Sequence, residues 1–308
     1  MFIPYQNMCI DESLMVFKGR LLFKQYIPSK RHRFGIRFFV MCDCKTGYVL
    51  DFIIYTEGTR EIGNFDIANI GKLGSIVLTL MNEYLNKGHT VYVGNWYTRP
   101  ALFSHLFANK TNACDTVKAN RKGMPVMNKK LKAGEIESKA SKNLLAIKWH
   151  DKRDVMLLST MHTNEFAPSD KVNHNTGKNV FKPITILDYK ENMGSIDWTD
   201  MMLSSTETVI KSIKWYKKTF SIYLTYPVLN APILYNQLTQ NKHPVREFQI
   251  NLIKQLLSTY HTPPITQVNW VGVQKLSILC YAYQLDISQH FFQQQNQNKT
   301  QQNVALYA

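Results

Sequence analysis

The apolar positions of the first 56 residues predict three strands. Residues 7–17 alternate in the way typical of a strand, although Asp11 places a carboxylate at its centre. Two further apolar runs, residues 34–42 and 48–56, flank a short turn that ends at Gly47. Runs of this length around a glycine turn indicate a β-hairpin. The chain is therefore expected to open with a meander of three strands.

From residue 73 onward, helical and strand patterns alternate. Residues 73–85 have the apolar spacing of a helix, and the short apolar run 89–95 is typical of a strand buried in a parallel sheet. A helix is predicted over 99–108 and another strand over 114–119. This order predicts an α/β fold in which helices cover the faces of a mixed sheet. It is the layout of a ribonuclease H-like core, although other α/β folds share parts of it.

The rest of the chain changes character three times. Residues 121–183 are basic and lack long periodic runs, which predicts an inserted subdomain with a β-hairpin turning at residues 150–153. Residues 184–210 are expected to complete the core with a helix. Residues 211–285 are mostly helical in pattern, with Pro227 and Pro232 as interruptions. The tail over residues 286–308 is rich in Gln and Asn and is predicted to be disordered.

Composition narrows the class of protein. The 308 residues are 44% hydrophobic, which is enough for one large core. No apolar run reaches the roughly 18 residues of a membrane helix, and the N-terminus does not resemble a secretory signal. The five cysteines follow no zinc spacing, so structural cysteines in a reducing compartment are favoured over metal ligands. None of the nine histidines is assigned to a metal.

The net charge of +15 favours a polyanionic partner, with nucleic acid ahead of an anionic membrane surface. A basic protein without such a partner is the alternative, but the cations are clustered, and one cluster surrounds two aromatic residues. Such interleaving suits phosphates and unstacked bases. The cations taken as candidate DNA-binding residues are Lys18, Arg31, Arg33, Arg121, Lys122, Lys214, Lys217 and Lys218.

Carboxylates at three places indicate metal-dependent phosphodiester chemistry. Asp11 lies within the first strand, and Asp197 and Asp200 share one face of a predicted helix. In a ribonuclease H-like core, these regions meet the end of the strand at 89–95. Carboxylates there hold two Mg²⁺ ions roughly 4 Å apart for in-line attack. Each site also has a plainer interpretation when it is taken alone. Asp11 could be a strand aspartate paired with a buried cation, and Asp197 and Asp200 could lie on a solvated helix face.

An ordered series of stretches resembles the piggyBac transposase family. They include IDESLMVFKGR, NKGHTVYVGNWYT, KWHDKRDVMLLST and NMGSIDWTDMM, and they run in family order from about residue 7 to 236. The resemblance implies a DDE/D-type transposase with a ribonuclease H-like core and an inserted domain. It also implies Mg²⁺ as cofactor, DNA as partner, nuclear localisation, and a DNA-binding or dimerisation role for residues 211–285, hence a possible homodimer.

The resemblance assigns roles to single residues. Asp11 corresponds to the first catalytic aspartate, Asp197 to the third, and Asp200 to a further functional aspartate; Asp11 and Asp197 would bind metal. The second catalytic position is occupied by Gly94. Neither neighbouring candidate is expected to replace it, because Asn95 would point to the opposite strand face and Asp115 would open the next parallel strand, at the far end of the sheet. At least a ~10³-fold loss of rate is expected, by analogy with deletions inside other catalytic units.

Other departures agree with this loss. The family usually has glycine at Asp115 and aspartate near Thr225. The resemblance also leads us to expect that the family's N-terminal DNA-binding portion and cysteine-rich tail have been lost. The leading hypothesis is therefore a domesticated, catalytically inactive DNA-binding protein derived from a transposase. The alternatives are a weakly active Mg²⁺-dependent nuclease or transposase that uses Asp11 and Asp197, and a truncated remnant without function.

Overall fold

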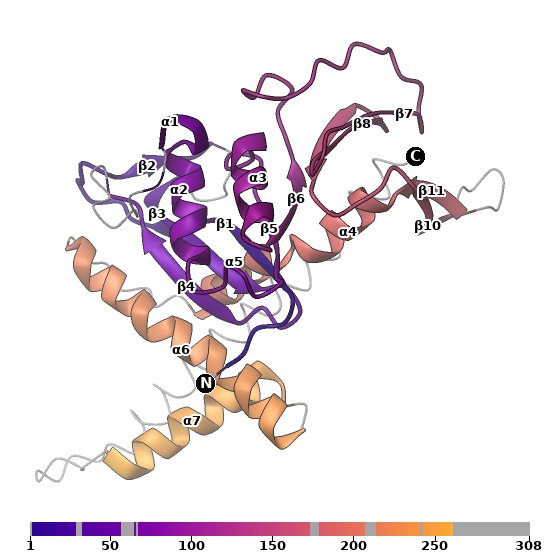
Figure 1. Cartoon of the computed structure of the whole chain (residues 1–308). Coiled ribbons are helices and arrows are strands. Elements are labelled where there is room, and N and C mark those ends of the chain that lie inside the picture. Colours follow the sequence, from indigo (N-terminus) through magenta and orange to yellow (C-terminus); the bar gives the residue numbers. More distant parts are fainter. Residues whose placement is uncertain are drawn as a thin grey trace, which may run out of the picture. The chain divides into compact units, whose positions relative to one another are not determined.

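The computed structural model of the chain describes residues 2–28, 33–56, 65, 67–172, 179–206, 214–240 and 243–260. It divides into two compact units, Met1–Asp200 and Met201–Ala308 (Figure 1). The Gln/Asn-rich tail predicted over 286–308 lies outside the described residues. No described helix is long and apolar enough to cross a membrane.

The first unit is built on a large mixed sheet whose strands run in the order β2-β3-β1-β5-β6-β9-β8-β7, with β4 also paired to β3. A separate two-stranded sheet pairs β10 with β11. The strands are β1 (Asn7–Val16), β2 (Gln25–Tyr26), β3 (Phe34–Asp43), β4 (Val49–Ile54), β5 (Thr90–Val93), β6 (Asn112–Thr116), β7 (Ile136–Ala140), β8 (Leu145–His150), β9 (Asp154–Ser159), β10 (Phe166–Val172) and β11 (Asn179–Pro183).

The strand pairing confirms the pattern expected from the sequence. β1, β3 and β4 form an antiparallel meander, and β1, β5 and β6 are parallel neighbours. The predicted hairpin around residues 150–153 is present as β8 and β9. β9 pairs with β6, so three strands of the basic segment 121–183 extend the central sheet. The domain boundaries drawn from the sequence stay predictions.

Helices cover both faces of the sheet. On one face, α2 (Lys72–Met81) and α3 (Pro100–Ala108) pack their apolar side chains against β1, β3, β5 and β6, and the short α1 (Ile67–Ile70) joins the same core. On the other face lie α4 (Ile184–Asn192) and the start of α5 (Ser195–Thr206). The Tyr92 hydroxyl of β5 donates to Asp188 of α4, and Ser195 of α5 donates to the Cys44 carbonyl. This second face carries the candidate site.

In the second unit, the described residues after 213 form two helices, α6 (Trp215–Thr239) and α7 (Val245–Tyr260). They contact each other, for example through the rings of Tyr235 and Phe248, 5.4 Å apart. The expectation that Pro227 and Pro232 interrupt this region is wrong, since both lie inside the continuous α6. Each proline removes one backbone donor, yet its fixed φ is compatible with a helix. Two lost hydrogen bonds do not end a helix of 25 residues.

Candidate functional site

The strand register brings Asp11 and Gly94 side by side. β1 pairs with β5 in parallel, with Ile10 opposite Val93, so the next residues along the two strands are Asp11 and Gly94. The Gly94 amide donates to the Ile10 carbonyl at 3.3 Å. Two distant stretches of sequence therefore meet where the resemblance implies two catalytic carboxylates.

The missing side chain of Gly94 would point at the Asp11 carboxylate. A Cβ atom built on Gly94 lies 2.7 Å from Asp11 Oδ1 and 3.5 Å from Tyr97 Cε2. The first of these contacts is too short for a real Cβ, so the Asp11 side chain occupies space that a residue with a side chain would need. Its carboxylate is the end of a rotatable side chain and can move aside. A carboxylate at position 94 would thus face that of Asp11.

Asp200 reaches the same strand through a hydrogen bond that the sequence did not reveal. Ser13 Oγ donates to Asp200 Oδ1 at 2.5 Å, and Ser13 lies two residues after Asp11, on the same strand face. The first turns of α5 are held over β3, because Thr199 Oγ1 lies 3.9 Å from Cys42 Sγ. Burial raises the pKa of the Cys42 thiol, which keeps it neutral beside Asp200.

Asp197 is placed differently from Asp200. It lies in the first turn of α5 with its side chain exposed. Within the described part of the chain, one set of three His, Cys, Asp or Glu side chains has ligand atoms within 4.8 Å of one another, and it contains none of Asp11, Asp197 and Asp200. Asp11, Asp197 and Asp200 therefore do not form such a close set of three ligands in the part of the chain that the structure describes.

The expected position of Asp115 is wrong. β6 spans Asn112–Thr116, so Asp115 lies near the carboxyl end of this strand, and the register with β5 places it level with Val93, beside Gly94. Asp115 is nonetheless fully buried and accepts hydrogen bonds from Thr98 and Thr116. Burial raises its pKa well above the ordinary value, against these hydrogen bonds. A buried carboxyl bound in this way does not replace the missing ligand.

The turn after Gly94 carries an exposed aromatic residue, Trp96, whose ring contacts a lysine side chain. Trp96 is 53% exposed, and Lys118 Nζ lies 4.7 Å from the centre of its ring, whereas Tyr97 is buried in the core. Arg121 Nη2 donates to the carbonyls of Asn95 and Trp96, at 2.9 and 2.8 Å. Of these two aromatic residues, only Trp96 is therefore available at the surface. Asn95 is exposed in the turn rather than on the strand.

The candidate DNA-binding cations fall into two sets. In the first unit, Lys18, Arg33 and Lys122 are exposed and Arg121 is half-buried. In the second unit, Lys214 and Lys217 are exposed and Lys218 is half-buried at the start of α6. Arg31 lies outside the described residues. The antiparallel pairing of β1 with β3 brings Lys18 and Arg33 to the same end of this strand pair.

The chain is similar to proteins of known family. A family model described as Transposase IS4 matches residues 1–232. The human PiggyBac transposable element-derived protein 3 is 24% identical over 277 residues, and the human Chimeric ERCC6-PGBD3 protein shows the same identity over the same length. The alignments cover 85% of this chain, but 46% and 26% of those two proteins, so the chain spans less than half of either.

Among solved structures, a cryo-EM structure of the piggyBac transposase synaptic complex with hairpin DNA superimposes with a TM-score of 0.70 at 22% identity. It covers 90% of this chain and 58% of that one. The likeness confirms the ribonuclease H-like α/β fold predicted from the sequence. Together with the family match over three quarters of the sequence, it shows that this chain belongs to the IS4/piggyBac-type family of DDE transposases.

Proposed function

We propose that this transposase-derived protein binds DNA in the nucleus and does not cut it. The proposal rests on the place that a side chain of residue 94 would occupy. A Cβ atom added to Gly94 would lie 2.7 Å from Asp11 Oδ1. An acidic residue at position 94 would therefore place its side chain opposite that of Asp11, and the position is proposed to be that of a lost catalytic carboxylate. In this chain it supplies only a hydrogen atom.

The loss of cleavage follows from charge and ligand number. Two divalent ions bring four positive charges, and Mg²⁺ takes carboxylate oxygens as its protein ligands. Asp11 has no acidic side chain opposite it at position 94, Asp115 is fully buried, and the Asp197 side chain is exposed. No other described carboxylate completes a three-ligand set with Asp11.

DNA binding is supported by features that do not depend on the metal. The chain carries a net charge of +15, and exposed cations lie at one end of β1 and β3 and around the turn after Gly94. Trp96 adds an exposed aromatic face held beside Lys118. Aromatic faces next to cations are the usual means of holding unpaired bases. The piggyBac transposase of similar fold has been seen with hairpin DNA.

The direct test is a DNA-binding titration at several salt concentrations, together with a cleavage assay in Mg²⁺ and Mn²⁺. If 6–10 phosphates are contacted, the affinity should fall about 10³- to 10⁵-fold between 50 and 200 mM salt. No strand cleavage is expected in either metal. Nicking that vanishes in Asp11→Ala would show that the site is active and would refute the proposal, and an affinity independent of salt would refute its DNA-binding part.

The exposed ring of Trp96 predicts that the protein prefers DNA with unpaired bases. Trp96→Ala should weaken binding to hairpin-ended or single-stranded DNA by about 5- to 150-fold, corresponding to ~1–3 kcal/mol for one stacked base. Binding to blunt duplex DNA should change little, because its bases are already stacked. Phe107→Ala, which removes an exposed aromatic ring at the end of α3, is the matched control. Equal losses on both kinds of DNA would argue against stacking at Trp96.

A further inference from the structure

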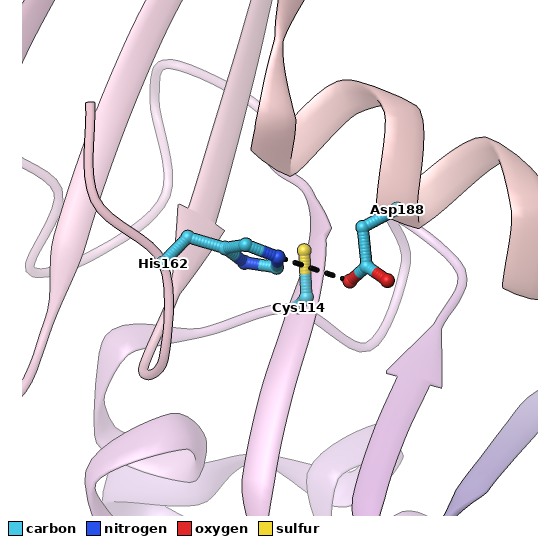
Figure 2. Close-up of side chains that lie close together, drawn as sticks. All are labelled: Cys114, His162 and Asp188. Atoms are coloured by element: carbon cyan, nitrogen blue, oxygen red, sulfur yellow. Dashed lines mark ion pairs between the residues drawn. The ribbon is translucent and has the colours of Figure 1, made fainter. Parts of the chain in front are cut away.

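Three side chains that are far apart in the sequence meet on the α4 face of the sheet. Cys114 comes from β6, His162 follows β9, and Asp188 lies on α4 (Figure 2). Their ligand atoms all lie within 4.8 Å of one another. His162 Nε2 and Asp188 Oδ2 face each other at 3.0 Å. Thiol, imidazole and carboxylate together form a mixed ligand set that suits zinc.

Neighbouring groups hold two of these ligands in place. Ser159 Oγ lies 2.7 Å from His162 Nδ1, the ring nitrogen that does not face the cluster. Tyr92 donates to Asp188 Oδ2 at 2.7 Å, and Asn192 Nδ2 donates to Asp188 Oδ1 at 3.1 Å. Metal-binding histidines and carboxylates are usually oriented by such outer hydrogen bonds. The arrangement therefore has an outer shell as well as three ligands.

We propose that Cys114, His162 and Asp188 bind one Zn²⁺ ion, at a site separate from the Asp11–Gly94 region. The thiolate and the carboxylate neutralise the two charges of the ion, and the imidazole binds in its neutral form. A neutral assembly suits this position, because the Cys114 side chain is fully buried and His162 is only 10% exposed. Asp188 is 25% exposed, which leaves an open side for a water molecule as fourth ligand.

The geometry needs only a small adjustment. Ligand bonds of ~2.0–2.3 Å in a tetrahedron separate the ligand atoms by roughly 3.3–3.8 Å. The imidazole and the carboxylate, 3.0 Å apart, must move apart by a few tenths of an ångström, and the Cys114 sulfur already lies within 4.8 Å of both. Without metal, burial raises the pKa of the Cys114 thiol. Binding therefore transfers the thiol proton to solvent as the Zn–S bond forms.

The consequence of the site would be structural. The three ligands belong to the core sheet, to the end of the β8–β9 hairpin and to α4, which directly precedes the helix that carries Asp200. An ion bound there would tie these elements together in the folded state. Because the unfolded chain lacks this arrangement, binding would raise the melting temperature of the protein in proportion to its affinity. This holds whether or not the protein binds DNA.

The test is a titration of the full, metal-free chain with Co²⁺ as a spectroscopic substitute for Zn²⁺, followed by Zn²⁺ competition. We expect one equivalent of Co²⁺ to produce a thiolate charge-transfer band in the near ultraviolet, and Zn²⁺ to abolish it and raise the melting temperature. Cys114→Ser should remove the band, and His162→Gln should weaken binding at least ~100-fold. The matched controls are Cys44→Ser and His150→Gln, which remove the same groups outside the cluster.

The measurement on the wild-type protein tests zinc binding without any substitution, so it remains valid even if a variant fails to fold. Circular dichroism would show whether each variant is folded. Absence of a thiolate band in the folded wild type would overturn the proposal. So would a band that survives in folded Cys114→Ser, or binding that is equally strong in His162→Gln. In those cases the cluster is a hydrogen-bonded network in which His162 pairs with Asp188.

Discussion

Replacing Gly94 with aspartate is expected to raise Mg²⁺-dependent nicking of DNA at least ~10³-fold over the unaltered chain. The new carboxylate would stand opposite Asp11, whose Oδ1 lies 2.7 Å from the position of the added Cβ. The Asp11 side chain would have to rotate, which is easy for the end of a flexible side chain and which the attraction of both carboxylates to a shared metal ion would favour. The assay is nicking of supercoiled plasmid with Mg²⁺ or Mn²⁺.

Two variants make the comparison specific. Gly94→Asn adds a side chain of nearly the same size without the negative charge and should stay inactive. The double variant Gly94→Asp with Asp11→Ala should lose whatever activity the single variant gains. If the unaltered protein is already as active as Gly94→Asp, the ligand argument is wrong and the chain is a working nuclease. If the single variant stays inactive, Gly94 is not the only defect.

Gly35→Ala is expected to destabilise the first unit by about 1–3 kcal/mol or more. Gly35 lies in β3 opposite Val16 of β1, and a Cβ atom there would meet the carbonyl oxygen of Met15 at 2.1 Å. The obstacle is the backbone of a central strand rather than a flexible side chain. The two strands would have to separate at the end where Lys18 and Arg33 lie.

The effect can be measured as a shift in the urea midpoint followed by circular dichroism. Gly194→Ala is the matched control, because a Cβ atom there meets nothing within 4 Å. It should leave the midpoint nearly unchanged. If the two variants were equally stable, the close approach of β1 and β3 at Gly35 would not exist in solution.

The order of the core elements could be predicted from the sequence, because the apolar runs of strands and helices differ in period and length. Their exact ends could not. The strand predicted over 114–119 in fact spans Asn112–Thr116, a shift of two or three residues. That shift moves Asp115 from the amino end of the strand to its carboxyl end, which is the end of the parallel strands where Gly94 lies. Strand ends depend on neighbouring strands, which the local pattern does not contain.

Contacts between distant elements could be predicted only where the family resemblance implied them. The convergence of the first strand with the strand before Gly94 was expected through the resemblance, and the register agrees with it. The hydrogen bond from Ser13 to Asp200 depends on how α5 lies over the sheet. The Cys114, His162 and Asp188 cluster spans three separate elements, so no spacing rule for metal ligands applies to it. Only the folded chain brings such residues together.

The hydrogen bonds of Arg121 to the main chain reduce what its side chain can contribute to DNA binding. Its Nη2 atom is engaged by two main-chain oxygens of the turn that carries Trp96, whereas the next residue, Lys122, is exposed. A guanidinium occupied in this way fixes the shape of the turn and has fewer free donors for a nucleotide backbone. Of the two adjacent cations, Lys122 should therefore release more counterions when the polyanion binds, and the formal charge of this segment overstates its electrostatic contribution.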